Sequence, residues 1–203
     1  MVNRVLTAIL VAGMGIVPAH AQDVVDFSGA KIGAIVGYDQ VRLGYGGEHE
    51  SKDGFLYGLT VGYDASIGAG IVGIEGEFSD ATTKDSATDL AGLGERWKLS
   101  AGRDLYIGAR LGFPVNPAVL LYTKAGYTNA RAKLSVSYEG DTASESDTLD
   151  GYRIGGGAEF SNGGHFARIE YRYSDYGNYE YKGFDTGIGA SRHQVAVTGG
   201  FRF

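Results

Sequence analysis

The feature that most constrains the fold of this chain is an alternation, with a period of two, between apolar residues and small or charged ones. The segment GFLYGLTVGYD (residues 54–64) shows it, since Phe55, Leu59 and Tyr63 share one parity while Gly58 and Gly62 share the other. Successive side chains of a β-strand point to opposite faces, so this periodicity predicts strands. We expect eight strands, at residues 29–40, 54–64, 70–79, 103–113, 119–130, 151–160, 165–175 and 192–203.

The two faces of these expected strands differ in kind. One parity is aliphatic or aromatic, whereas the other combines glycine with large charged groups of both signs. A soluble sandwich or lipocalin places an apolar face inside and a polar face outside. Glycine beside charge instead suits the polar interior of a narrow closed barrel whose apolar outside contacts lipid. We therefore predict an all-β fold, an eight-stranded antiparallel up-and-down transmembrane β-barrel.

The charged parity defines a candidate site inside this barrel. Its members are Glu75, Glu77, Arg110, Lys124, Arg153, Glu159, Arg168, Glu170 and Arg172, and Lys31, Asp39 and Arg202 share their parity. One interpretation is a constriction that selects ions, and the other is a plug of mutually neutralised charges, because a buried charge must be paired. Eight strands leave little interior space, which favours the plug.

The connections and the aromatic residues support the same architecture. Short connections at 64–69, 114–118 and 161–164 alternate with long ones at 41–53, 80–102, 131–150 and 176–191, as in outer-membrane barrels with periplasmic turns and termini. Two aromatic belts should flank an aliphatic band at the two membrane interfaces. The expected inner belt is Tyr63, Phe113, Phe160, Phe201 and Phe203, and the expected outer belt is Tyr38, Phe55, Phe78, Tyr127, Tyr152 and Tyr173.

The N-terminus predicts export. Arg4, the apolar run 5–17 and the small-x-small tripeptide 19–21 have the layout of a signal peptide, which we expect to be cleaved after Ala21. A retained membrane anchor is the alternative. Residues 22–203 then form a single barrel domain. The chain has no cysteine, which excludes disulfides and thiolate chemistry, and its formal net charge of −6 argues against nucleic acid as a partner.

Several stretches resemble a known family. They are GIEGEFS (73–79), ARLGF (109–113), LLYTKAGYT (120–128), GGGAEF (155–160) and ARIEYRYSDYG (167–177). Together they are similar to the small outer-membrane β-barrel proteins of the OmpA-like, opacity-type family, especially its alphaproteobacterial surface-antigen branch. Tyr106 stands where such proteins often carry tryptophan. The alternating C-terminal strand that ends on Phe201 and Phe203 resembles the signal read by the barrel assembly machinery of Gram-negative bacteria.

Three further stretches of the sequence bear on possible chemistry. GAGIVG (68–73) fits a dinucleotide pattern, but the segment after it alternates by two instead of opening a helix, so we expect a turn. Ser191 and His193 share a lipid-facing parity, as in lipid A-modifying barrels, with Asp185 as a conceivable orienting acid. The acidic stretch 139–150 lacks the spacing of a calcium-binding EF-hand loop. We expect no catalytic residue, no cofactor and no metal, and we place Trp97 in the second long loop.

The resemblance implies a surface structural protein, antigen or adhesin more than an enzyme. We expect a non-enzymatic protein of the Gram-negative outer membrane that anchors four extracellular loops for envelope integrity or surface interaction. A small or gated porin is the alternative, and a lipid A-modifying enzyme is a third reading. The expected partners are outer-membrane lipid, the barrel assembly machinery during biogenesis, and a host or envelope ligand at the loops.

Overall fold

The computed structural model describes residues 27–45, 48–88, 96–138, 141–162, 164–181 and 184–203. The expected signal peptide, residues 1–21, lies outside this part of the chain. The strands are β1 (Gly29–Tyr45), β2 (Glu48–Ile67), β3 (Gly70–Ala81), β4 (Lys84–Thr88), β5 (Arg96–Asn116), β6 (Val119–Tyr138), β7 (Asp141–Asn162), β8 (His165–Tyr181) and β9 (Phe184–Arg202). Among the described residues, no helix is long and apolar enough to cross a membrane.

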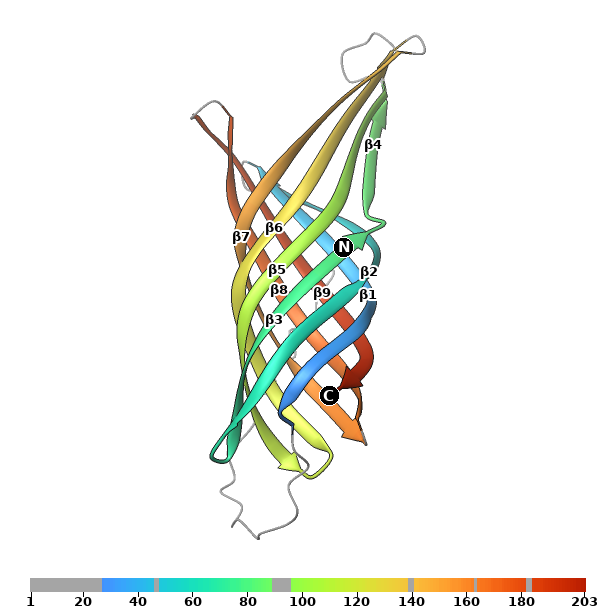
Figure 1. Cartoon of the computed structure of the whole chain (residues 1–203). Coiled ribbons are helices and arrows are strands. Elements are labelled where there is room, and N and C mark those ends of the chain that lie inside the picture. The colour runs from blue at the N-terminus through green and yellow to red at the C-terminus, as the bar shows by residue number, and fades with distance from the viewer. Residues whose placement is uncertain (1–26, 46–47, 89–95, 139–140, 163, 182–183) are drawn as a thin grey trace, which may run out of the picture.

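The strands form one closed antiparallel barrel (Figure 1). Consecutive strands pair with each other, apart from β3 and β4, and β1 pairs with β9, so the first and last strands lie side by side. β3 and β4 both pair with β5 and are separated by a break at Thr82 and Thr83. They are therefore two segments of one barrel strand, which gives eight strands around the wall. The predicted eight-stranded antiparallel barrel is confirmed, and among the described residues the β1–β9 and β3–β5 pairings close its wall.

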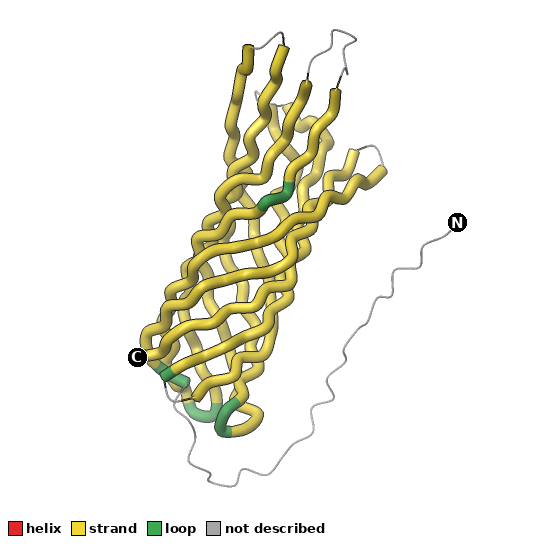
Figure 2. Tube along the Cα trace, turned by 90° about the vertical axis from the view of Figure 1, so that its right-hand side faces the viewer, coloured by secondary structure: helices red, strands yellow, loops and turns green. Residues whose placement is uncertain are grey.

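The two ends of the barrel differ (Figure 2). At one end, which we call the turn end, adjacent strands are joined by the short connections at 68–69, 117–118 and 163–164, and the C-terminus lies there. Gly68 has a φ of 59°, which only glycine adopts without strain, and it makes the two-residue turn between β2 and β3. GAGIVG is therefore a turn that leads into a strand, as expected.

At the other end, which we call the hairpin end, the strands run well past the barrel wall (Figure 2). The prediction of long loops was wrong here. The β1–β2 ladder continues to Tyr45↔Glu48, and the β6–β7 ladder continues to Tyr138↔Asp141. Trp97 lies within β5, paired with Ala87 of β4 and Val136 of β6, and not in a loop. Period-two alternation weakens where neither face of a strand meets hydrocarbon, so the pattern did not mark these extensions.

The alternation separates the two faces of the wall as expected. Ile74 and Ile107, on the apolar parity, are 68% and 66% exposed, whereas Glu75 next to Ile74 is 2% exposed. Ring-bearing residues occupy the two ends of this apolar surface, with Tyr38 opposite Phe55 toward the hairpin end and Phe201 opposite Ile32 toward the turn end. The exposed apolar side chains thus form a band that only hydrocarbon could cover favourably.

Candidate functional site

The lumen of the barrel is filled by charged side chains. All nine residues that the sequence placed there are buried, as are six further charged residues that point the same way. The basic members of this lumen network are Lys31, Arg110, Lys124, Arg153, Arg168, Arg172, Arg192 and Arg202. Its acidic members are Asp39, Asp64, Glu75, Glu77, Asp104, Glu159 and Glu170. Every member lies within ion-pair distance of at least one opposite charge.

The centre of the network is built on Glu77 of β3. Its carboxylate lies 2.7 Å from Lys124 Nζ, 3.1 Å from Arg153 Nη1 and 2.5 Å from Arg172 Nη1. Lys124 in turn contacts Glu170 Oε1 at 2.8 Å. Basic residues from three strands, β6, β7 and β8, therefore converge on one carboxylate of β3, which ties opposite walls of the barrel together.

The turn-end half of the network is built on Asp64 and Glu159. Asp64 Oδ2 lies 2.8 Å from Lys31 Nζ and 3.3 Å from Arg202 Nη1. Glu159 accepts a hydrogen bond from Arg110 Nη1 at 3.0 Å and another from Arg202 Nη2. These contacts join β1, β2, β5, β7 and β9 and so hold the first and last strands at the seam where the barrel closes.

The hairpin-end half is built on Asp39 and Asp104. Arg192 bridges the two acids, with Nη2 at 2.9 Å from Asp39 Oδ1 and Nη1 at 3.0 Å from Asp104 Oδ2. Thr83, in the break between β3 and β4, donates its hydroxyl hydrogen to Asp39 Oδ2 at 2.6 Å. Thr128 donates to Asp104 Oδ1 at 2.7 Å. Charge and neutral polar groups together close this half of the lumen.

Two tyrosines complete the centre of the lumen, and the alternation did not mark them because it was read as glycine and charge. The Tyr122 hydroxyl donates to Glu170 Oε2 at 2.7 Å, and the guanidinium carbon of Arg110 lies 4.2 Å from the Tyr122 ring centre. Lys124 Nζ lies 4.8 Å from the Tyr106 ring centre. Such cation–π contacts favour the charged state of a buried base.

Six charged members of the lumen lie outside the nine that were predicted from the sequence. Lys31, Asp39 and Arg202 were seen on the charged parity but were not joined to the network. Asp64 and Asp104 lie at the ends of expected strands, and extending the parity by one or two residues would have found them. Arg192 is the first residue of the last expected strand. Its side chain is 4% exposed and points inward, but the predicted charged face did not include it.

Taken together, these contacts leave the lumen occupied along its length. Isolated charges cannot be buried cheaply, and here each one is offset by partners across the barrel. Two apolar clusters also lie in the interior: Phe27, Ile71 and Leu120 in one, and Ile35, Leu56 and Ala196 in the other. The arrangement is suited to holding the wall together.

The pair Ser191 and His193 lies on the outer surface near the hairpin end. His193 Nδ1 is 2.7 Å from the Tyr171 hydroxyl, and its ring centre is 5.0 Å from that of Tyr173. Ser191 hydrogen-bonds to Tyr173. Each member of the pair therefore has a tyrosine as its hydrogen-bond partner among the described residues, and the side chain of Asp185 lies outside what the structure describes.

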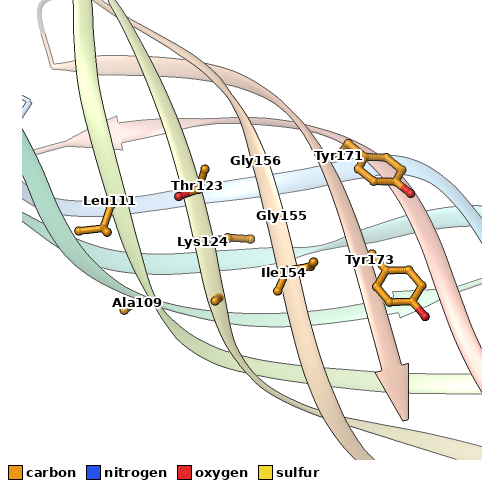
Figure 3. Close-up of a pocket in the computed structure, with 10 residues that line it drawn as sticks. Ala109, Leu111, Thr123, Lys124, Ile154, Gly155, Gly156, Tyr171 and Tyr173 are labelled. Carbon is orange, nitrogen blue, oxygen red and sulfur yellow. The ribbon is translucent and has the colours of Figure 1, made fainter. Parts of the chain in front are cut away.

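A hollow of about 530 Å³ lies on the outside of the wall across β5, β6, β7 and β8 (Figure 3). Ala109 and Gly156 are among its small residues, while Leu111, Ile154 and Tyr171 are half-exposed beside it. These residues belong to the lipid-facing parity. Lys124 and Gly155, on the inward parity, also line the hollow, which is a depression in the apolar outer surface.

Just beyond the outer belt, two aspartates accept hydrogen bonds from belt tyrosines or amides. Asp150 accepts from the Tyr127 hydroxyl and from Asn129 Nδ2, the latter at 2.6 Å. Asp53 accepts from Gln40 Nε2 at 3.1 Å. Among the described residues, no group of three or more acids, histidines or cysteines could hold a metal ion. The side chains of the other acids of 139–150 lie outside the described set.

The chain matches the family described as "Outer membrane protein beta-barrel domain" over residues 9–193. The protein belongs to this family. It is 31% identical over 146 residues to the 22 kDa outer membrane protein of Rhizobium leguminosarum bv. viciae, an alignment that covers 71% of this chain and 59% of that protein. The chain therefore spans less than two thirds of that relative's length.

A second relative is the 25 kDa outer-membrane immunogenic protein of Brucella abortus biovar 1 (strain 9-941). It is 27% identical over 154 residues, covering 71% of this chain and 67% of that protein. Both organisms are alphaproteobacteria, so the resemblance stated from the sequence is confirmed. The crystal structure of Neisserial surface protein A (NspA) shares the fold, with a TM-score of 0.51 at 18% identity over 86% of this chain and 99% of that chain.

Proposed function

We propose that this outer-membrane barrel is a non-enzymatic, non-conducting surface protein that anchors four extracellular hairpins. The observation that carries the proposal is the lumen network, in which fifteen charged side chains are buried and paired along the barrel. A lumen filled in this way supports the wall and offers ions no path. The extended hairpins are then the part of the molecule available to the surroundings.

The orientation follows from the family architecture. In outer-membrane barrels short turns and termini face the periplasm and long connections face outward. The turn end would then lie in the periplasm and the hairpins outside the cell, after export directed by residues 1–21 and cleavage after Ala21. The names of the relatives, one of which is an immunogenic protein, support exposure of the hairpins. A host or envelope ligand would meet the protein there.

We also propose that Phe201 and Phe203 mark the final strand for the barrel assembly machinery. Both rings point outward, at 52% and 79% exposure, and the Phe203 amide donates to the Ala30 carbonyl at 2.9 Å. The strand that would be read by the machinery is thus the strand that pairs with β1. Support for this role comes from the placement of the rings and from the resemblance at the C-terminus.

The two alternative functions, a porin and a lipid A-modifying enzyme, have less support. A pore would need an unfilled lumen, which the ion pairs of Glu77 and its neighbours occupy. A lipid A-modifying enzyme would need His193 to reach Ser191, yet the Nδ1 atom of His193 lies 2.7 Å from the Tyr171 hydroxyl. No described contact activates the serine.

Single cysteines test the surface display directly, because the chain has none of its own. We expect Ser51→Cys, on β2 in the β1–β2 hairpin, to react with a membrane-impermeant maleimide on intact cells. The matched control Ala69→Cys, in the β2–β3 turn, should react only after the outer membrane is opened. Labelling of Ala69→Cys but not Ser51→Cys on intact cells would overturn the proposed orientation and with it the display of the hairpins.

A further inference from the structure

The lumen network is not electrically balanced. Its eight basic and seven acidic side chains leave one positive charge among the described residues, all within a wall that faces hydrocarbon. A net buried charge is far more costly than a paired one. We propose that the turn-end half of the lumen binds one small monovalent anion of the halide class beside Arg110 and Arg168.

The imbalance can be assigned to one half of the lumen. Toward the hairpin end, Lys124, Arg153, Arg172 and Arg192 meet four acids: Asp39, Glu77, Asp104 and Glu170. Toward the turn end, Lys31, Arg110, Arg168 and Arg202 meet three acids: Asp64, Glu75 and Glu159. Two acids are shared between the halves, since Lys124 Nζ lies 2.9 Å from Glu75 Oε1 and Arg168 Nη2 lies 3.6 Å from Glu77 Oε1. The surplus positive charge therefore lies near the turn end.

Hydrogen-bond donors are in surplus at the same place. Nine nitrogen atoms of basic lumen side chains lack a hydrogen-bond partner, against two oxygen atoms of carboxylate or amide groups. Four of the nine are Nε and Nη2 of Arg110 and Nε and Nη2 of Arg168. Arg110 Nε lies 3.6 Å from Asp64 Oδ1 and Arg168 Nη2 lies 3.6 Å from Glu77 Oε1, which is too long for a hydrogen bond. These two side chains are 1% and 3% exposed. Donors buried to this degree need an acceptor, and a buried donor without one is expensive.

Arg110 and Arg168 are close enough to share one anion. Both approach the same oxygen of Glu75, Arg168 through a direct hydrogen bond and Arg110 with Nη1 at 3.8 Å. Both guanidinium groups also flank the Tyr122 ring, at 4.2 Å and 5.8 Å from its centre. Glu75 offsets one of these two positive charges, and a second anion beside the unused N–H groups would offset the other and accept their hydrogen bonds.

Charge and enclosure favour a monovalent, compact anion. One negative charge brings the lumen to neutrality, whereas a dianion would overshoot it. Water could satisfy the donors but would leave the charge in place. Phe27, Ile71 and Leu120 pack together next to this half of the lumen, and the Phe27 carbonyl accepts a hydrogen bond from Arg202. An anion enclosed there should enter during folding and exchange slowly afterwards.

Bromide is the probe for this site, because it replaces chloride and scatters X-rays anomalously. We expect crystals of barrel refolded in sodium bromide to show one anomalous peak within hydrogen-bond distance of Arg110 and Arg168. Barrel refolded at increasing chloride should also unfold at a higher midpoint than barrel refolded in gluconate at equal ionic strength. The shift should saturate with concentration, as for a ligand of the folded state alone.

Two variants separate a lumen site from a general salt effect. Lys31→Met removes one positive charge from the turn-end half without touching either arginine, and we expect it to abolish the halide-dependent shift. Arg42→Met, on the outer surface of β1, should keep it. The proposal is overturned if wild-type midpoints are equal in the two salts, or if bromide peaks occur only outside the lumen. The wild-type comparison decides the matter even if Lys31→Met fails to fold.

Discussion

At the scale of single residues, the structure is governed by the cost of burying charge. Fifteen ionisable side chains lie inside the wall, and the Coulombic attraction between opposite charges must offset their loss of hydration. Removing one partner is therefore more damaging than its own contacts suggest, because it leaves the others buried and unpaired. The most connected acid, Glu77, should show the effect most clearly.

We expect Glu77→Gln to lower the free energy of unfolding by about 3–5 kcal/mol, since Lys124, Arg153 and Arg172 each lose a carboxylate partner. Urea unfolding of the barrel in detergent micelles measures this change. Asp53→Asn, an acid on the outer surface, is the matched control and should leave the unfolding free energy nearly unchanged. Equal stabilities of the two variants would contradict the account of the lumen.

The acids just outside the outer belt provide a test by titration. The hydrogen bond from Tyr127, and then that from Asn129, hold the pKa of Asp150 below its ordinary value. Asp53 is held low in the same way by Tyr38 and Gln40. A carboxyl whose pKa is depressed on folding stabilises the folded state above its ordinary pKa, and this stabilisation is lost as the pH falls through the folded value.

We expect Tyr127→Phe to raise the pKa of Asp150 toward its ordinary value while leaving that of Asp53 in place. Tyr38→Phe should do the reverse. NMR titration of the carboxyl carbons in micelles measures both values in each variant. Unchanged titration of Asp150 in Tyr127→Phe would show that the hydrogen bond does not form in solution.

At the scale of the strands, each face has its own steric demand. Inward-facing glycines lie against neighbouring backbone. A Cβ added at Gly126 of β6 would contact the Ile107 carbonyl oxygen and the Gly108 Cα atom. At Gly199 of β9, which faces outward, nothing lies within 4 Å of such a Cβ. Glycine is thus required inside the wall by close approach and is not required sterically outside it.

Gly126→Ala should therefore destabilise the barrel, because backbone atoms cannot move aside as a flexible side chain can. Gly199→Ala, on another strand and the opposite face, should unfold close to the wild-type urea midpoint. The two midpoints, measured in the same micelles, test whether the inward glycines serve packing. A larger loss for Gly199→Ala would contradict the assignment of the two faces.

The strands also show which parts of the fold the sequence could predict. Within the membrane, each strand has lipid on one side and packed charge on the other. The alternation alone therefore predicted the eight strands of the barrel and nine of its charged lumen residues. Beyond the aromatic belts, the two faces of a strand no longer differ in this way. For this reason the sequence did not predict β4 or the position of Trp97 within β5. Tyr106 and Tyr122 were missed because an aromatic ring can serve either face.

At the scale of the whole molecule, the sequence predicted which charged residues point inward but not which of them pair. Glu77 contacts Arg153 and Arg172, which lie 76 and 95 residues away along the chain. Such contacts depend on the tilt and stagger of the closed barrel, and local periodicity carries no information about either. The closure of the barrel turns a list of inward charges into a continuous filling.

The central claim is that this filling closes the lumen, and single-channel recording of the refolded protein in planar lipid bilayers tests it most directly. We predict no steady, reproducible conductance for the wild-type barrel at moderate voltage. Heat-modifiable migration on gels should establish that the inserted protein is folded. Steady channels of uniform conductance from such folded protein would contradict the account.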